Sequence, residues 1–106
     1  MQQNPFTIGQ VRAFWDAVAA KYDRINKGMG WTHSERFLTM QKFLPHLERA
    51  HVLNVWSRTG SAVPFIHERI PHATILNLEA SPSFMAIAKE RFPRETFSQT
   101  DLHDLP

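Results

Sequence analysis

Two acidic residues and one short turn in this sequence have the type and spacing that a binding site requires. Glu79 and Asp101 each follow a short predicted strand, and a third such strand leads into the turn at residues 56–60, Trp-Ser-Arg-Thr-Gly. A helix beginning after this turn would present unpaired N–H groups and a partial positive charge, which suit a carboxylate or a phosphate. Glu79 lies nineteen positions after Gly60, close to the spacing at which an acidic residue meets ribose hydroxyls in dinucleotide-binding folds. Together these features predict a nucleoside-containing ligand.

Each feature taken alone also has a purely structural interpretation. A turn with one glycine between a strand and a helix is common. A glutamate at a strand end, such as Glu79, is usually a solvated cap or an ion-pair partner, and Asp101 would equally start a turn. The functional interpretation therefore depends on the three features lying together.

The segments that must position these residues alternate between strand and helix. Short β-branched and apolar runs predict strands, and helical patterns lie between them. The expected strands are residues 52–56, 74–79 and 96–99, and the expected helices are residues 61–70 and 82–92. Ser81 and Pro82 mark the start of the second helix as its N-cap and first helical residue. This alternation indicates a parallel sheet, which binds ligands at its carboxyl edge.

Two further helices are expected ahead of the sheet. Apolar residues at helical spacing over residues 11–22 predict a long helix that ends near Gly28, with Gly30 as a turn residue. A capping box at residues 32–35 starts the second helix, and Pro45 ends it.

The expected fold class is therefore α/β. We expect a partial doubly wound, Rossmann-like three-layer sandwich with parallel strands, which stops before the full sheet is complete. Residues 1–50 form the leading helices, and residues 51–106 form a ligand-binding βαβαβ unit. Further strands would be needed to complete such a sheet, so we expect the chain to be a fragment.

Four segments resemble class I S-adenosylmethionine-dependent methyltransferases. Residues 52–60 (VLNVWSRTG) are similar in part to the first motif of that family, a hydrophobic pair, an acidic residue and then G-x-G-x-G. Residues 75–85 (ILNLEASPSFM) resemble the second motif, and residues 99–106 (QTDLHDLP) resemble the third. Residues 14–23 (FWDAVAAKYD) are similar to the leader of quinone-type and other small-molecule methyltransferases. The resemblance spans nearly the whole chain.

The resemblance implies S-adenosylmethionine as cofactor and a small molecule as methyl acceptor. It implies that Glu79 holds the ribose hydroxyls and that Asp101 accepts a hydrogen bond from the adenine amino group. Ala80 would lie beside the adenine, and the Leu102 backbone would read the edge of the ring. Tyr22 would close over the cofactor. The turn that includes Trp56, Ser57, Arg58 and Gly60 would pass the methionine end.

The first motif departs from the family at three positions. Trp56 and Arg58 stand where the family usually has glycines, and Asn54 stands where it often has an acidic residue. Trp56 would block the cofactor, point into the core or stack on the ligand. Arg58 would pair with the methionine carboxylate or face solvent. These alternatives stay open at the level of sequence.

Composition narrows the partners and the location. The formal net charge is +2, and basic and acidic residues are interleaved without a run of either sign, so we expect no nucleic-acid partner. There are no cysteines, no apolar stretch long enough to span a bilayer and no signal-peptide pattern at the start. The six histidines do not have the spacing of a zinc site on a helix. We therefore expect a cytoplasmic protein with no membrane partner and no metal.

Two rival functions remain at this level. A nicotinamide-dependent dehydrogenase is disfavoured because the G-x-G-x-x-G fingerprint is absent. A non-catalytic binding or assembly module, with a degenerate cofactor site, is favoured by Trp56 and Arg58. We also expect the chain to form homo-oligomers through exposed sheet edges and to transfer no methyl groups on its own.

Overall fold

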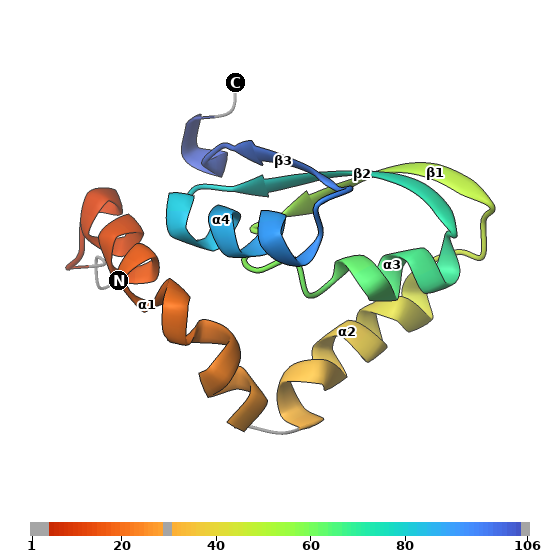
Figure 1. Cartoon of the computed structure of the whole chain (residues 1–106), viewed down its shortest axis with the longest axis horizontal. Coiled ribbons are helices and arrows are strands. Elements are labelled where there is room, and N and C mark those ends of the chain that lie inside the picture. Colours follow the sequence, from red (N-terminus) through yellow and green to blue (C-terminus); the bar gives the residue numbers. More distant parts are fainter. Residues whose placement is uncertain (1–4, 29–30, 105–106) are drawn as a thin grey trace.

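Short apolar runs separated by helix-forming segments fold into three parallel strands with helices packed against them (Figure 1). The computed structural model describes residues 5–28 and 31–104. Its elements are α1 (Ile8–Gly28), α2 (Trp31–Phe43), β1 (Arg49–Val55), α3 (Val63–Arg69), β2 (His72–Glu79), α4 (Pro82–Arg91), β3 (Thr96–Gln99) and a 3₁₀ turn (Leu102–Asp104). The expected α/β class and element order are confirmed.

The sheet is open and has the order β1-β2-β3. Leu53 pairs with Leu76 between the first two strands, and Leu78 pairs with Ser98 between the second and third. In Figure 1 the α-helices lie below or beside the sheet as drawn, and none of the described α-helices lies above it. The described residues therefore supply two layers of the expected three-layer sandwich.

The core lies between the sheet and the helices below it. Ala62, Val63, Ile66 and Ile75 are buried together, and partly buried side chains of α2, including Phe37 and Met40, pack against them. A separate aromatic contact joins α1 to α4, where the fully buried Phe84 ring meets Tyr22 edge-on with ring centroids 4.9 Å apart. These two contacts hold both leading helices against the βαβαβ unit.

Local signals set most element boundaries. Ser81 accepts a hydrogen bond from the Phe84 N–H at 3.2 Å and Pro82 follows it, as the N-cap pattern predicts. Strands β1 and β2 begin earlier than expected, at Arg49 and His72, because these polar residues pair with each other in the parallel ladder.

Three further boundary expectations are wrong. Helix α3 begins at Val63, because hydrogen bonds from Gly60 N–H to the Ser57 carbonyl and from Val63 N–H to the Gly60 carbonyl form turns first. Strand β1 ends at Val55, since Trp56 has a positive φ of 52°. Helix α2 begins at Trp31, one residue before the expected cap at Thr32. The side chain of Thr32, the turn residue Gly30 and the motif end at residues 105–106 lie outside the described residues.

Candidate functional site

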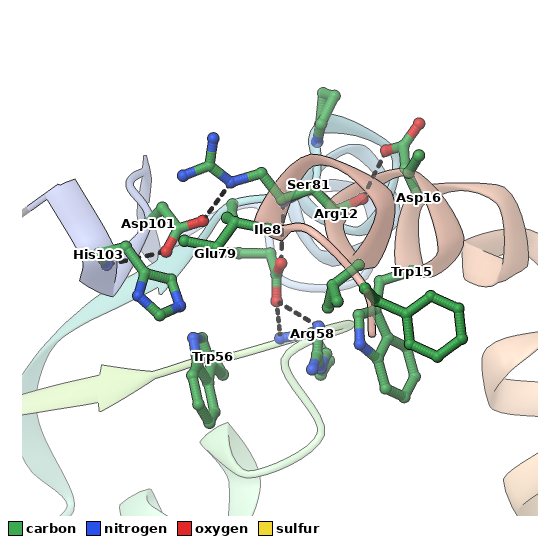
Figure 2. Close-up of a pocket in the computed structure, with 15 residues that line it drawn as sticks. Ile8, Arg12, Trp15, Asp16, Trp56, Arg58, Glu79, Ser81, Asp101 and His103 are labelled. Atoms are coloured by element: carbon green, nitrogen blue, oxygen red, sulfur yellow. Dashed lines mark hydrogen bonds and ion pairs between the residues drawn. The ribbon is translucent and has the colours of Figure 1, made fainter. Parts of the chain in front are cut away.

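A hollow of about 690 Å³ lies at the carboxyl edge of the sheet (Figure 2). Its walls come from α1, from the turn after β1 and from the ends of β2 and β3. Five residues singled out from the sequence line it: Trp56, Arg58, Glu79, Ala80 and Asp101. The volume lies within the range of small-molecule and cofactor sites. The three sequence features therefore do lie together.

A second hollow of about 360 Å³ adjoins the same turn on the side of α2. Tyr22, Asn54 and Ser57 line it, and Trp56 and Arg58 border both hollows. Among the described residues, the buried Ser57 hydroxyl finds no hydrogen-bond partner. Such a group costs free energy unless something bonds to it. Its oxygen is covered by protein atoms, so a ligand in the hollow would reach it only if the turn moved.

Glu79 lies at the end of β2, where it lines the first hollow, and only 1% of its surface is exposed. Its Oε1 accepts from the Arg58 N–H at 2.8 Å and its Oε2 accepts from the Ser81 N–H at 2.9 Å. The Arg58 guanidinium lies 3.8 Å from Oε1. The interpretation of Glu79 as a solvated cap is wrong. Because an ionised carboxylate has about four acceptor positions, Glu79 keeps capacity for a ligand hydroxyl.

Asp101 is also buried, and it starts the 3₁₀ turn. Its Oδ1 accepts from the His103 N–H at 2.9 Å, and its Oδ2 accepts from Arg12 Nε of α1 at 2.5 Å. The His103 N–H, followed by Arg12, lowers the pKa of the Asp101 carboxyl below its usual value, although burial opposes this. Asp101 thus has both roles left open by the sequence, a turn residue and a carboxylate facing the hollow.

Trp56 and Arg58 have the backbone conformation that glycine adopts most readily. Both have φ of 52°, in the left-handed region, and Gly60 has φ of 81°. The turn thus has the left-handed conformation at two bulky residues, at a cost of about 1–2 kcal/mol each. Trp56 is 52% exposed at the edge of the hollow, so the alternative that it points into the core is wrong.

Arg58 turns back across the hollow toward α1. Its guanidinium lies over the Trp15 ring, 4.3 Å from the centroid, and 5.4 Å from that of Phe84 (Figure 2). Only 23% of its side chain is exposed. The alternative that Arg58 simply faces solvent is wrong, because it joins Glu79 to the aromatic face of α1.

The remaining expected residues lie in the second hollow or outside both hollows. Tyr22 is at the second hollow and not at the first. Gly60 and Leu102 line neither, although Leu102 directly follows Asp101. A Cβ at Gly60 would come within 2.8 Å of the Phe92 ring, so this glycine serves close packing. Their assignment to cofactor binding remains a prediction.

Asn54 has a structural partner in the neighbouring strand. Its Nδ2 donates to Asn77 Oδ1 at 2.9 Å, and Asn77 Nδ2 donates to the Thr96 carbonyl at 3.0 Å. Asn77 is fully buried. This chain of amides crosses all three strands, and sequence reasoning gave no role to Asn77.

Sequence reasoning also missed how α1 is attached. Asp16 Oδ1 accepts from Ser81 Oγ at 2.6 Å and from the Ser83 N–H at 3.1 Å, and these bonds lower the pKa of the Asp16 carboxyl, the Ser81 bond most. Asp23 accepts from Thr59 Oγ1 at 2.6 Å. The signal was available, because Asp16 and Asp23 are seven residues apart, each after an aromatic residue, and therefore share a helix face.

No metal site or membrane span is found in the described part of the chain. Among residues 5–28 and 31–104, no group of three or more histidine or carboxylate side chains is placed to hold a metal ion. No described helix is both long and apolar enough to cross a bilayer. His67 instead bonds to Glu95 through Nε2 at 2.7 Å.

Solved structures define the class of fold to which this geometry corresponds. The DhpI–SAM–HEP complex matches with a TM-score of 0.71 at 20% identity, over 98% of this chain and 47% of that chain. Haemonchus contortus phosphoethanolamine N-methyltransferase 1, in complex with phosphoethanolamine and S-adenosylhomocysteine, gives 0.66 at 20% identity, over 94% and 23% of the two chains. At such identities the likeness shows the fold alone, a partial Rossmann-like fold.

A curated relative gives a closer likeness in sequence. The demethylmenaquinone methyltransferase of Chlamydia caviae is 33% identical over 102 residues, which are 91% of this chain and 42% of the relative. The chain thus spans less than half the length of that relative. No family model matches the sequence. The resemblance to methyltransferases seen in the motifs is confirmed as a likeness.

Proposed function

We propose that this chain is the cofactor-binding half of an S-adenosylmethionine-dependent methyltransferase that acts on a small molecule. One observation carries the proposal. The buried carboxylates of Glu79 and Asp101 and the turn at residues 56–60 surround one hollow of about 690 Å³. The likeness to the Chlamydia caviae methyltransferase supports the same reading. The small-molecule acceptor follows from that likeness and from the interleaved surface charges.

The residues present fit such a cofactor in chemical type. Glu79 and Asp101 are acceptors with free lone pairs for ribose hydroxyls and for the adenine amino group. Ala80 and the Leu102 backbone would lie along the adenine. The turn that carries Trp56, Ser57 and Arg58 would lie along the methionine end. Bound S-adenosylmethionine would supply an activated methyl group.

This chain's own residues would orient the ligand and exclude water from it. Helix α1 lines one side of the hollow with apolar side chains, including Ile8 and Val11, and Arg12 bonds the helix to Asp101. A ligand that excludes water from this site would strengthen the electrostatic contacts made inside it. Holding the ligand in the reactive orientation lowers the barrier to in-line transfer of the methyl group.

A second candidate function is a non-catalytic binding or assembly module. It is favoured by a specific observation: Arg12 and Arg58 already pair with the two carboxylates that the cofactor would use. A ligand that bonds to either carboxylate would have to share it with the arginine or displace the arginine from it. A module that kept the fold and lost the cofactor would show the same contacts.

Titration calorimetry with S-adenosylhomocysteine and, separately, with NAD distinguishes the candidates. Saturable binding of the first ligand alone supports the methyltransferase half. Binding of NAD alone would favour a dehydrogenase, and binding of neither would favour the module. Glu79→Gln should abolish nucleoside binding if Glu79 holds the ribose. Glu90→Gln, exposed on α4, is the matched control and should bind like the unchanged chain.

Three further expectations belong to this proposal. The chain acts as part of a larger domain, so labelled S-adenosylmethionine should show no turnover with the chain alone. It forms homo-oligomers through its exposed sheet edges, and the exposed apolar face of the sheet would add to the contact between copies. It resides in the cytoplasm, which microscopy of a tagged chain would check.

A further inference from the structure

Arg58 places a fixed positive charge between the two hollows. It lines both of them, together with Trp56. Its guanidinium is held on one side by the Trp15 ring at 4.3 Å and on the other by Glu79 at 3.8 Å. Because it is stacked and largely covered, this charge is not free to move into solvent.

The charge changes the electrostatic balance of the first hollow. Three carboxylates (Asp16, Glu79 and Asp101) and two guanidiniums (Arg12 and Arg58) line it, beside His103. Glycine at position 58 would leave three carboxylates against one guanidinium. A more negative hollow attracts a cationic ligand more strongly, and Coulomb interactions are less screened there than in bulk water.

We propose that Arg58 is a specificity-determining residue that weakens binding of a cationic sulfonium nucleoside relative to the uncharged thioether nucleoside. This inference rests on the proposed function, since it assumes that the hollow takes an adenosine with a methionine-derived tail. The sulfonium of S-adenosylmethionine is positive, and its thioether counterpart S-adenosylhomocysteine lacks that charge. The two nucleosides differ only in the S-methyl group and the positive charge that comes with it. A change in their affinity ratio when the charge at position 58 is removed, but not when it is kept, therefore reports the electrostatic effect.

Backbone hydrogen bonds hold the Glu79 carboxylate independently of the Arg58 side chain. The two backbone N–H groups of residues 58 and 81 donate to its oxygens at 2.8 and 2.9 Å. Neither bond involves the guanidinium. Replacing the Arg58 side chain therefore removes one positive charge and leaves these two hydrogen bonds in place.

The test is calorimetric titration of both nucleosides into the unchanged chain and three variants at position 58. Arg58→Met removes the charge and keeps an unbranched side chain, Arg58→Gly also relieves the positive φ, and Arg58→Lys keeps the charge. In the Met and Gly variants we expect the dissociation constant of S-adenosylmethionine, divided by that of S-adenosylhomocysteine, to fall by about fivefold or more. The reason is that each variant removes one positive charge close to the sulfonium. The Lys variant should keep the ratio of the unchanged chain.

Arg24→Met is the control for overall charge, because Arg24 is exposed on α1 and lines neither hollow. It should leave the ratio unchanged. Equal ratios in all forms, with both nucleosides bound, would overturn the role of Arg58 and leave the proposed function standing. Binding of neither nucleoside by any form would overturn the proposed function and this inference with it.

Discussion

At the scale of single residues, the turn after β1 holds two bulky side chains in a backbone conformation that suits glycine best. Trp56 and Arg58 both have φ of 52°, which glycine adopts without steric cost. The sequence has Trp56 and Arg58 at positions where the resembled motif has glycines, but it gave no sign that their backbone would have a positive φ. Positive φ at a tryptophan is set by the hydrogen bonds of the surrounding turn, such as that from the Ser57 N–H to the Leu78 carbonyl at 3.0 Å.

The strain at position 56 predicts an unusual order of stability. Trp56→Ala and Trp56→Gly remove the same exposed ring, but only glycine relieves the positive φ. We expect the Gly variant to be more stable than the Ala variant by about 1 kcal/mol, because the left-handed penalty for a Cβ is of that size. Urea unfolding of both variants measures the difference. At an ordinary helical position such as exposed Ala17, glycine is expected to be less stable than alanine by about 1 kcal/mol.

At the scale of elements, helix α1 is attached by carboxylates at both ends of the hollow. Asp16 caps the start of α4 through Ser81 and Ser83, and Asp101 receives Arg12. The sequence predicted the helix and its apolar face, because 3.6-residue periodicity is local information. It did not predict these contacts, since each joins residues more than sixty positions apart.

Acid should release this attachment. The pKa values of Asp16 and Asp101 are both lowered in the folded chain. A lowered folded pKa gives stability that is present above the unfolded value, near 3.9 for Asp, and is lost as the pH falls through the folded value. The urea midpoint of the unchanged chain should therefore fall more steeply below about pH 4 than that of the double variant Asp16→Asn with Asp101→Asn. Identical acid dependence in the two chains would contradict this account.

Ser81 joins two elements through one hydroxyl. It accepts from the Phe84 N–H and donates to Asp16 Oδ1. Ser81→Ala should lower the free energy of unfolding by about 1–2 kcal/mol, the usual cost of losing an N-cap. Ser34→Ala, at an exposed position on α2, should change it by less than about 0.5 kcal/mol. Denaturant unfolding of the two variants side by side measures both, and equal losses would leave Ser81 without a capping role.

At the scale of the whole molecule, the order of elements and the location of the site followed from the sequence. Glu79 and Asp101 were expected at one edge because parallel strands end there. The pairing of Asn54 with Asn77 was not predictable, because it depends on strand register. It was also not predictable that the turn at residues 56–60 borders two hollows, because the second hollow depends on how α2 packs.

One face of the sheet carries no α-helix of the described chain (Figure 1), and this bare face exposes apolar side chains. Leu53 and Leu76 are paired in register on this face and are 56% and 40% exposed. Val55, two residues on, is 36% exposed. Adjacent apolar side chains on an open sheet favour association between copies. We therefore expect the apparent mass of the chain, measured by light scattering, to rise with concentration.

Leu53→Lys should reduce that association, because a charge at the centre of the face must be desolvated when two copies meet. Leu38→Lys is the matched control, since Leu38 is 42% exposed on α2, away from the sheet. It should leave the concentration dependence unchanged. If Leu38→Lys dissociates the chain while Leu53→Lys does not, the contact lies on the helices. A monomeric mass for the unchanged chain at every concentration would show that the bare face makes no contact between copies.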